Sequence, residues 1–222
     1  MPSTFTIAFP PGVTVGKWTR AFTERHPEVE LRVVRMAEAD QEETLRSGGA
    51  DMAFVREPFD RSGFHLIPLY EEDVVVMMNH EHLLTLEKTL VTADLADETL
   101  LTAPPDEAVL RRVAADEGVA VLPQSVAKAL RRKDVVARKV EDAEPSRIGL
   151  AWPREGQHDL VDEFIGIVRG RTAHSSRNPD VAAAEAATGK KQQKRDSRPA
   201  RPARQAPRSN TQRPSHGRRK GR

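Results

Sequence analysis

The 222-residue sequence contains no cysteine, and this absence excludes disulfides, thiolate metal ligands and a cysteine nucleophile. Without disulfides to form, nothing in the sequence argues for a location outside the cell. The N-terminal residues lack both the basic region and the long apolar run of a signal peptide. No stretch approaches the roughly 20 apolar residues needed to span a bilayer. We therefore expect a soluble, cytoplasmic protein without a membrane partner.

The sequence also lacks recognisable catalytic patterns. It contains no G-x-S-x-G, H-E-x-x-H, Walker A or G-x-G-x-x-G sequence. Adjacent acid pairs such as Glu71–Glu72 point in different directions, so we interpret them as solvated surface. Nothing assembles a nucleophile, a base and an orienting group. We predict that the protein is not an enzyme and uses no cofactor.

Positive and negative charges are divided unevenly along the chain. Residues 171–222 contain 15 Lys or Arg and 3 Asp or Glu, whereas residues 1–170 contain 20 and 30. Such asymmetry is typical of an acidic folded body with a basic appendage. Large apolar residues become scarce in the same place, so the C-terminal segment cannot offset its chain entropy by burial. We predict a domain at residues 1–171 and a disordered basic tail at 172–222.

Strand and helix patterns alternate through the first part of the chain. Residues 4–9, 29–34 and 50–55 resemble strands, and helices are expected between them. In the first helix, Trp18 and Phe22 share one face, and Thr14 is the expected N-cap. Later strands are expected in residues 64–78, 119–123 and 147–152, with a closing amphipathic helix over 158–170. This alternation predicts an α/β domain over residues 4–170 with a mainly parallel sheet.

Five segments in the same order resemble the effector-binding domains of LysR-type transcriptional regulators. They are FTIAFPPGVTVGKWTRAFTERHPEVEL, LRSGGADMAFVREP, IPLYEEDVVVMMNHEHLL, VTADLADETLL and VAADEGVAVLPQSVA. The resemblance covers roughly residues 4–170, the size of a single domain. It implies a two-lobed fold of the type 2 periplasmic-binding-protein kind, with a small effector bound between the lobes.

Two features depart from that family. The first strand begins at about Thr4, which leaves no room for the family's N-terminal winged helix-turn-helix. The second lobe is shortened near residues 103–113, because only APPDEA lies between ETLLT and VLRRVAADEG, and one parallel crossover needs about a dozen residues. We expect Val119, Val121 and Leu122 to lose their cover and become exposed. Self-association or low stability, and weak or absent effector binding, should follow.

The resemblance and the sequence together suggest four effector-binding residues. Free amides and the helix dipole at Thr14 and Val15 could cradle an anion, although an ordinary turn would look the same. Arg56, after a predicted strand, could pair with an effector carboxylate, or with Glu57 or solvent. The hydroxyl of Thr102 could face the cleft, or serve a simple turn.

Histidine and basic residues raise two further possibilities. His80 and His82, with His65 upstream, lack a converging third ligand, so we predict no metal site. The basic tail suits non-specific, salt-dependent contacts to nucleic acid, or serves solubility alone. The residues proposed for such contacts are Lys190, Lys191, Lys194, Arg195, Arg218, Arg219 and Lys220.

The prediction is therefore an effector-sensing domain related to LysR-type regulators, without its own DNA-reading module. Its expected partners are a small organic anion and either a second copy or a partner regulator. The alternative is a nucleic-acid-associated protein that binds non-specifically through its tail.

Overall fold

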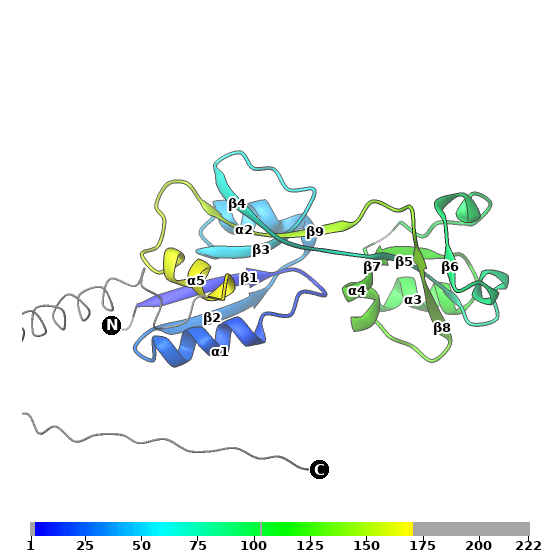
Figure 1. The fold of residues 1–222 in the computed structure, drawn as a ribbon, viewed down its shortest axis with the longest axis horizontal. Helices are drawn as coiled ribbons and strands as arrows, with labels where there is room; N and C mark the ends of the chain where they lie inside the picture. The colour runs from blue at the N-terminus through cyan, green and yellow to red at the C-terminus, as the bar shows by residue number, and fades with distance from the viewer. Residues whose placement is uncertain (1–2, 103, 171–222) are drawn as a thin grey trace, which may run out of the picture. The chain divides into compact units, whose positions relative to one another are not determined.

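Residues 3–102 and 104–170 are described by a computed structural model, in which helices and strands build two β-sheets (Figure 1). We call residues 3–72 and 146–170, which contain the five-stranded sheet, the first lobe. Residues 73–145, which contain the four-stranded sheet, form the second lobe. The predicted α/β, two-lobed architecture is confirmed. The prediction that residues 172–222 are disordered lies outside the described residues.

The first lobe has strand order β2-β1-β3-β9-β4. Strand β1 runs parallel to β2 and β3, whereas β9 runs antiparallel to β3 and β4. Its elements are β1 (Thr4–Phe9), α1 (Gly16–Arg25), β2 (Glu30–Arg35), α2 (Gln41–Arg46), β3 (Met52–Arg56), β4 (Phe64–Glu72), β9 (Ser146–Pro153) and α5 (Val161–Val168), with a short 3-10 helix at Glu38–Asp40.

The second lobe has strand order β6-β8-β5-β7. Strand β5 is antiparallel to β7 and β8, and β6 is parallel to β8. Its elements are β5 (Val74–Asn79), β6 (Thr89–Leu90), α3 (Glu107–Ala114), β7 (Ala120–Pro123), α4 (Gln124–Ala129) and β8 (Val135–Val140), with 3-10 helices at Leu83–Leu86 and Thr92–Leu95.

The expectation of a mainly parallel sheet is wrong. In both sheets, parallel and antiparallel neighbours are mixed. In the first sheet, the reason is that the chain passes to the second lobe after β4 and returns to the first lobe in β9. An outgoing strand and a returning strand that lie side by side must be antiparallel. The alternation of strands and helices along the sequence does not reveal this long-range return.

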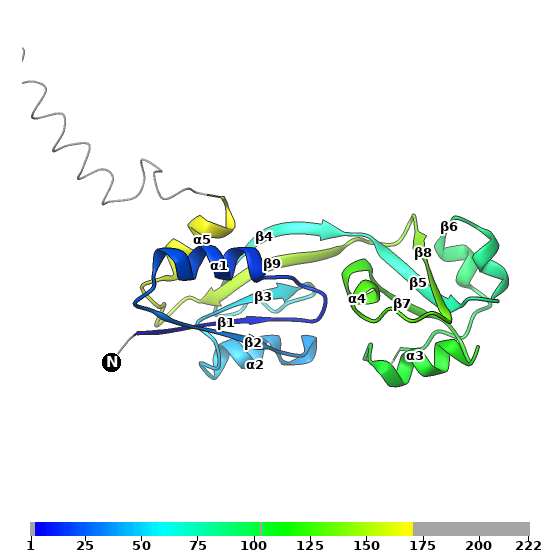
Figure 2. The same ribbon diagram turned by 90° about the horizontal axis from the view of Figure 1, so that it is seen from below.

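Aromatic packing joins the first sheet to its helices. Helix α1 brings Phe22 against Phe5 with ring centroids 5.4 Å apart, and Trp18 against Phe54 at 4.9 Å. Helices α1 and α5 cover one face of this sheet and α2 covers the other (Figure 2). The expected shared face of Trp18 and Phe22 is thus confirmed. The expected N-cap is wrong, because Val15 occupies that position and no side chain caps α1.

In the second lobe, helix α3 follows the strand-like segment around Leu100 after a very short connection. The Asp106 carboxylate caps α3 by accepting hydrogen bonds from two backbone amides of its first turn. A single parallel bridge joins Leu100 to Val119 ahead of β7. No complete strand–helix unit therefore lies between Thr102 and the start of α3 in the described structure.

The expected exposure of the β7 region is correct at one position and wrong at two. Val121 is 40% exposed, whereas Val119 is fully buried and Leu122 is 8% exposed. Val119 packs with apolar side chains of β5, β6 and β8, and Leu122 packs beneath α3 and α4. The remaining elements therefore cover both faces of the sheet here.

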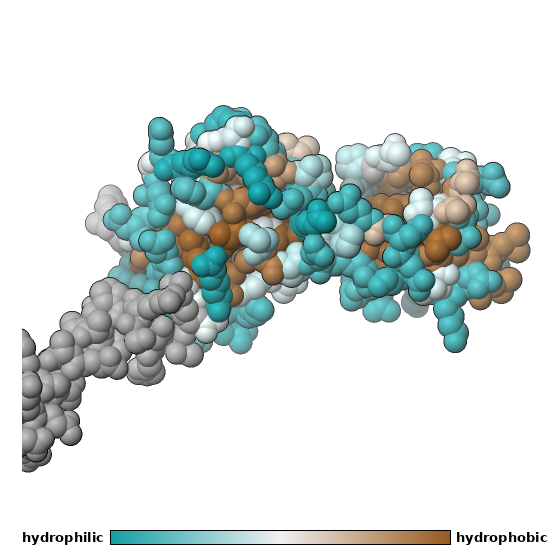
Figure 3. Space-filling model, turned by 45° about the horizontal axis from the view of Figure 1, so that its top comes forward, coloured by the Kyte–Doolittle hydropathy of each residue, from teal (hydrophilic) through white to brown (hydrophobic). Residues whose placement is uncertain are grey.

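Apolar atoms nevertheless reach the surface of the second lobe (Figure 3). Leu83, Leu86 and Leu100 are exposed there together with Val121. Over residues 3–102 and 104–170, no helix is long and apolar enough to cross a membrane.

Candidate ligand site at the lobe junction

Arg56 is a buried cation at the end of β3. The residue is 4% exposed, and arginine is almost never fully buried in a protein unless it is paired. The Gln41 side chain fixes its backbone: the amide oxygen accepts from Arg56 N at 2.6 Å and the amide nitrogen donates to Arg56 O at 3.1 Å. Strand β3 and helix α2 thus hold this cation in one place.

The Arg56 guanidinium donates hydrogen bonds to four separate segments. Nε donates to the Glu38 carboxylate at 2.6 Å, and Nη2 donates to the carbonyl of Pro11 at 3.1 Å. Nη1 donates to Glu72 Oε1 and to Ser146 Oγ. These partners lie in the 3-10 helix before α2, the β1–α1 loop, the end of β4 and the start of β9. Arg56 therefore ties together the segments that surround the lobe junction.

Glu72 extends this network into the second lobe. Its side chain is 11% exposed, and Oε2 accepts a hydrogen bond from Ser125 N in α4 at 2.9 Å. Burial alone would raise the pKa of the Glu72 carboxyl, but hydrogen bonds from Arg56 and Ser125 and the Arg56 charge hold that pKa below its ordinary value. The carboxylate therefore stays ionised at neutral pH. The interpretation of the Glu71–Glu72 pair as solvated surface is wrong for Glu72.

The β1–α1 loop packs closely against the start of α4. A Cβ on Gly12 would lie 2.4 Å from Ser125 Oγ and 2.8 Å from Val126 N, closer than real contacts allow. Gly12 also has φ of +83°, a conformation that side chains disfavour. Glycine is therefore required where the two lobes touch.

A cavity of about 460 Å³ opens beside Arg56. Both lobes contribute to its wall, which consists of Arg56, Glu57, Pro58, Pro123, Glu144, Pro145, Ser146 and Arg147. The Arg147 side chain is 47% exposed and donates to Glu71 at 3.0 Å and to Glu144 at 3.1 Å. The wall thus contains one buried and one half-exposed guanidinium, each paired with carboxylates of the chain, and an organic anion would compete with these carboxylates.

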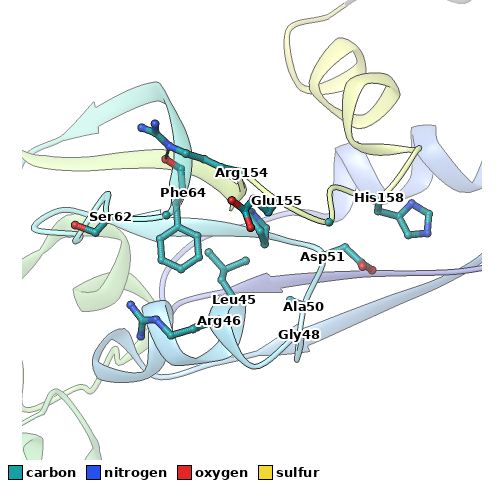
Figure 4. Close-up of a pocket in the computed structure, with 13 residues that line it drawn as sticks. Leu45, Arg46, Gly48, Ala50, Asp51, Ser62, Phe64, Arg154, Glu155 and His158 are labelled. Carbon is teal, nitrogen blue, oxygen red and sulfur yellow. Dashed lines mark hydrogen bonds between the residues drawn. The ribbon is translucent and has the colours of Figure 1, made fainter.

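A second cavity of about 600 Å³ lies within the first lobe (Figure 4). Its polar side chains serve the local structure. The Asp51 carboxylate accepts from Thr6 N at 2.7 Å, and Arg154 Nε donates to the carbonyl of Phe64 at 3.0 Å. Arg46 lies over the Phe64 ring at 5.7 Å and its side chain is 54% exposed. This cavity has no buried cation, so the junction cavity is the better candidate.

The four predicted effector-binding residues are not gathered in one place. Arg56 lines the junction cavity, whereas Thr14, Val15 and Thr102 do not. Thr14 and Thr102 are exposed, and the Val15 side chain belongs to the first-lobe core at 6% exposure. The role of all four in effector binding remains a prediction. The expected pairing of Arg56 with Glu57 or solvent is wrong, since Glu57 pairs with Arg61 instead.

The three histidines singled out in the sequence lie in different places and have different neighbours. His82 Nε2 lies 3.2 Å from Glu98 Oε2, and the His65 ring packs against Trp152. His80 lies at the surface near Glu81. Within the part of the chain that the structure describes, no group of three His, Cys, Asp or Glu side chains could hold a metal ion. The seven basic residues proposed for nucleic-acid contact lie outside the described residues.

Sequence comparisons converge on one family. The model for the LysR substrate binding domain matches residues 2–112 and 102–173. The transcriptional regulator MetR of Salmonella typhimurium is 25% identical over 192 residues, covering 74% of this chain and 60% of MetR. AlsR of Bacillus subtilis is 21% identical over 178 residues, covering 67% of this chain and 59% of AlsR. The chain thus spans about 60% of the length of these relatives.

Solved structures with the same fold include LysR-type proteins. The BenM effector binding domain with its effector benzoate has a TM-score of 0.64 at 18% identity, covering 78% of this chain and 96% of that domain. The reduced OxyR regulatory domain from Pseudomonas aeruginosa has a TM-score of 0.59 at 17% identity, covering 76% and 95%. At these identities the structures establish the shared fold.

Proposed function

The chain belongs to the family of LysR substrate-binding domains, and we propose that it senses a small organic anion bound in the junction cavity beside Arg56. The named relatives are transcriptional regulators, so we infer a regulatory rather than an enzymatic role. Regulation of transcription would place the protein in the cytoplasm, with a second copy or a partner regulator bound to it.

The buried guanidinium of Arg56 is the observation that carries this proposal. Guanidinium recognises carboxylates through paired, charge-assisted hydrogen bonds, and Arg56 is one of the residues that line a cavity to which both lobes contribute. A ligand there would contact the end of β3 and the start of β9 at once. The structurally similar BenM domain is described with benzoate, a small carboxylate, as its effector. A carboxylate is therefore the first ligand class to test.

The second lobe is proposed to be shortened near residues 103–113. The alignment with MetR of Escherichia coli runs over 196 residues although it covers 75% of this 222-residue chain, so it includes positions that this chain lacks. The family model also matches in two pieces that overlap at residues 102–112, the pattern expected of an internal deletion. A smaller second lobe would contribute fewer contacts to a ligand, so we expect weak binding.

A thermal-shift titration tests the proposal. The melting temperature of the full chain is measured against formate, acetate, benzoate and succinate, with sodium chloride at matched ionic strength as the reference. A ligand that binds the native state raises the melting temperature with its concentration. We expect this rise for at least one acid, and we expect Arg147→Gln to reduce it. The matched variant Arg46→Gln, in the other cavity, should show the same ligand-induced rise in melting temperature as the wild type.

Nucleic-acid binding through the tail is the alternative function, and residues 172–222 carry the charge that favours it. Deleting these residues should abolish any binding to DNA or RNA and leave anion binding intact. Binding should weaken steeply as salt is raised, because phosphate contacts release counterions. Nucleic-acid affinity that survives the deletion would contradict this alternative.

A further inference from the structure

The carboxylate of Glu72 accepts hydrogen bonds from one donor of each lobe. One of its oxygens accepts from the Arg56 guanidinium and the other accepts from the backbone amide of Ser125. Both donors are therefore engaged by a group that belongs to the chain itself. The side chain is 11% exposed, so solvent does not replace these contacts.

Building on the function proposed above, we propose that Glu72 is an internal ligand of the junction site. Its carboxylate occupies Arg56 of the first lobe and Ser125 of the second lobe, and a free carboxylate binds these donors by displacing it. The ligand class is thus a monocarboxylate whose charged end replaces that of Glu72.

Tethering gives Glu72 an advantage over a free acid. A group held by a short tether acts at an effective concentration in the millimolar range or above. A simple acid such as acetate must exceed this concentration to displace Glu72 from the intact protein. An acid that also contacts the adjoining cavity of about 460 Å³, which includes Arg147, gains contacts that Glu72 cannot make. The internal ligand therefore selects for acids with a body that fills this cavity.

The geometry also relates ligand exchange to the two lobes. Glu72 is the last residue of β4, and Asp73 separates it from β5 of the second lobe. The carbonyl of Asp73 accepts a hydrogen bond from Gln124 N at 2.9 Å, one residue before Ser125. Displacing the Glu72 side chain would remove its bond to α4 at the point where the chain passes between the lobes. An entering acid would thereby change a contact between the lobes.

Removing the internal ligand should create a measurable acetate site. In Glu72→Ala, Arg56 keeps Glu38, Ser146 and Pro11 as partners, but the donors used by Glu72 become free. We expect the variant to melt at a lower temperature than the wild type. Acetate should then raise its melting temperature by roughly 3–6 °C per tenfold increase in concentration above the dissociation constant. Chloride at matched ionic strength should give a smaller rise.

Two controls make the experiment decisive. Glu72→Gln fills the same space without the negative charge, so acetate should not enter and its melting temperature should follow chloride. The wild type should need at least tenfold more acetate than Glu72→Ala for the same response. If Glu72→Ala does not fold alone, its refolding yield from urea is measured with acetate and with chloride. Acetate should increase that yield selectively.

The proposal is overturned if Glu72→Ala responds equally to acetate and chloride, or if the wild type and Glu72→Gln respond to acetate as strongly as Glu72→Ala. This test differs from the screen of acids on the wild type, because it depends on the response of Glu72→Ala to acetate. If no acid stabilises the wild type but acetate rescues Glu72→Ala, the internal-ligand proposal stands and the sensing function fails. If an acid stabilises the wild type without rescue of Glu72→Ala by acetate, the opposite conclusion follows.

Discussion

Replacing Arg56 with methionine removes the guanidinium and leaves a side chain that fills much of the same buried space. The variant loses hydrogen bonds to two carboxylates, each worth roughly 1.5–3 kcal/mol when one partner is charged. Glu38 is 43% exposed and can regain water, whereas Glu72 is 11% exposed and would remain a largely buried, uncompensated charge. Breaking a buried ion pair costs about 3–5 kcal/mol, and the exposure of Glu38 favours the lower half of that range.

Urea denaturation of the full chain measures this loss. With a slope near 2 kcal/mol per molar urea, a loss of about 3–4 kcal/mol lowers the midpoint by roughly 1.5–2 M. The double variant Arg56→Met/Glu72→Gln removes both members of the pair. The double variant no longer contains a buried carboxylate without its guanidinium partner. Its loss of unfolding free energy should therefore be smaller than the sum of the two single losses by about 1–3 kcal/mol.

Two results would refute this reasoning. One is a loss below about 1 kcal/mol for Arg56→Met, the range of an exposed ion pair. The other is additivity of the two single substitutions, which would show that Arg56 and Glu72 do not stabilise each other. Arg56→Lys is the matched control, because it keeps the charge but cannot reach all four partners. Its stability should lie between those of the wild type and Arg56→Met.

Four further predictions follow from individual positions. Gly12→Ala should destabilise the protein more than Gly48→Ala in urea titrations, because both have positive φ but a Cβ on Gly48 meets nothing within 4 Å. Leu110→Ala should cost about 2–5 kcal/mol in the same assay, because this core residue of the second lobe is 2% exposed. Tyr70 is the only tyrosine, and burial followed by the Glu72 charge raises its pKa, so tyrosinate absorbance should show a lower pKa in Glu72→Gln. Folding lowers the pKa of Glu72 from 4.5. The difference in unfolding free energy between the wild type and Glu72→Gln should therefore be largest above pH 4.5 and should shrink as the pH falls through the folded-state pKa.

Local sequence patterns were sufficient to predict most elements of the first lobe. The apolar run at residues 4–9 and the i, i+4 spacing of Trp18 and Phe22 correspond to β1 and α1. The strands expected in residues 64–78 correspond to β4 and β5, which are separated by Asp73. These features depend on neighbouring residues, which is why periodicity detects them.

Sequence patterns did not predict the features that depend on residues far apart along the chain. The antiparallel return of β9 beside β3 and β4 joins residues far apart in the chain, and local patterns cannot specify it. Val119 was expected to be exposed because an apolar strand with missing neighbours should lose its cover. Its burial by β5, β6 and β8 arises from long-range packing within the second lobe.

The site was predicted in part. Arg56 was identified from its place after a buried strand, but its partners were not. Glu38 and Glu72 lie 18 and 16 residues away, and Ser146 lies 90 residues away. An acidic residue at the end of a strand next to another acid resembles solvated surface, so nothing in the local sequence marks Glu72 as buried. Glu72 becomes a partner of Arg56 because β3, β9 and β4 are neighbours in the folded sheet.

Amide resonances measured by NMR during a titration with benzoate test the central claim most directly. Binding in the junction cavity predicts concentration-dependent shifts at Glu57, Ser125, Ser146 and Arg147, with little change at Arg46 in the first-lobe cavity. Shifts confined to the surroundings of Arg46, or saturable binding that leaves Ser125 and Ser146 unmoved, would contradict the account.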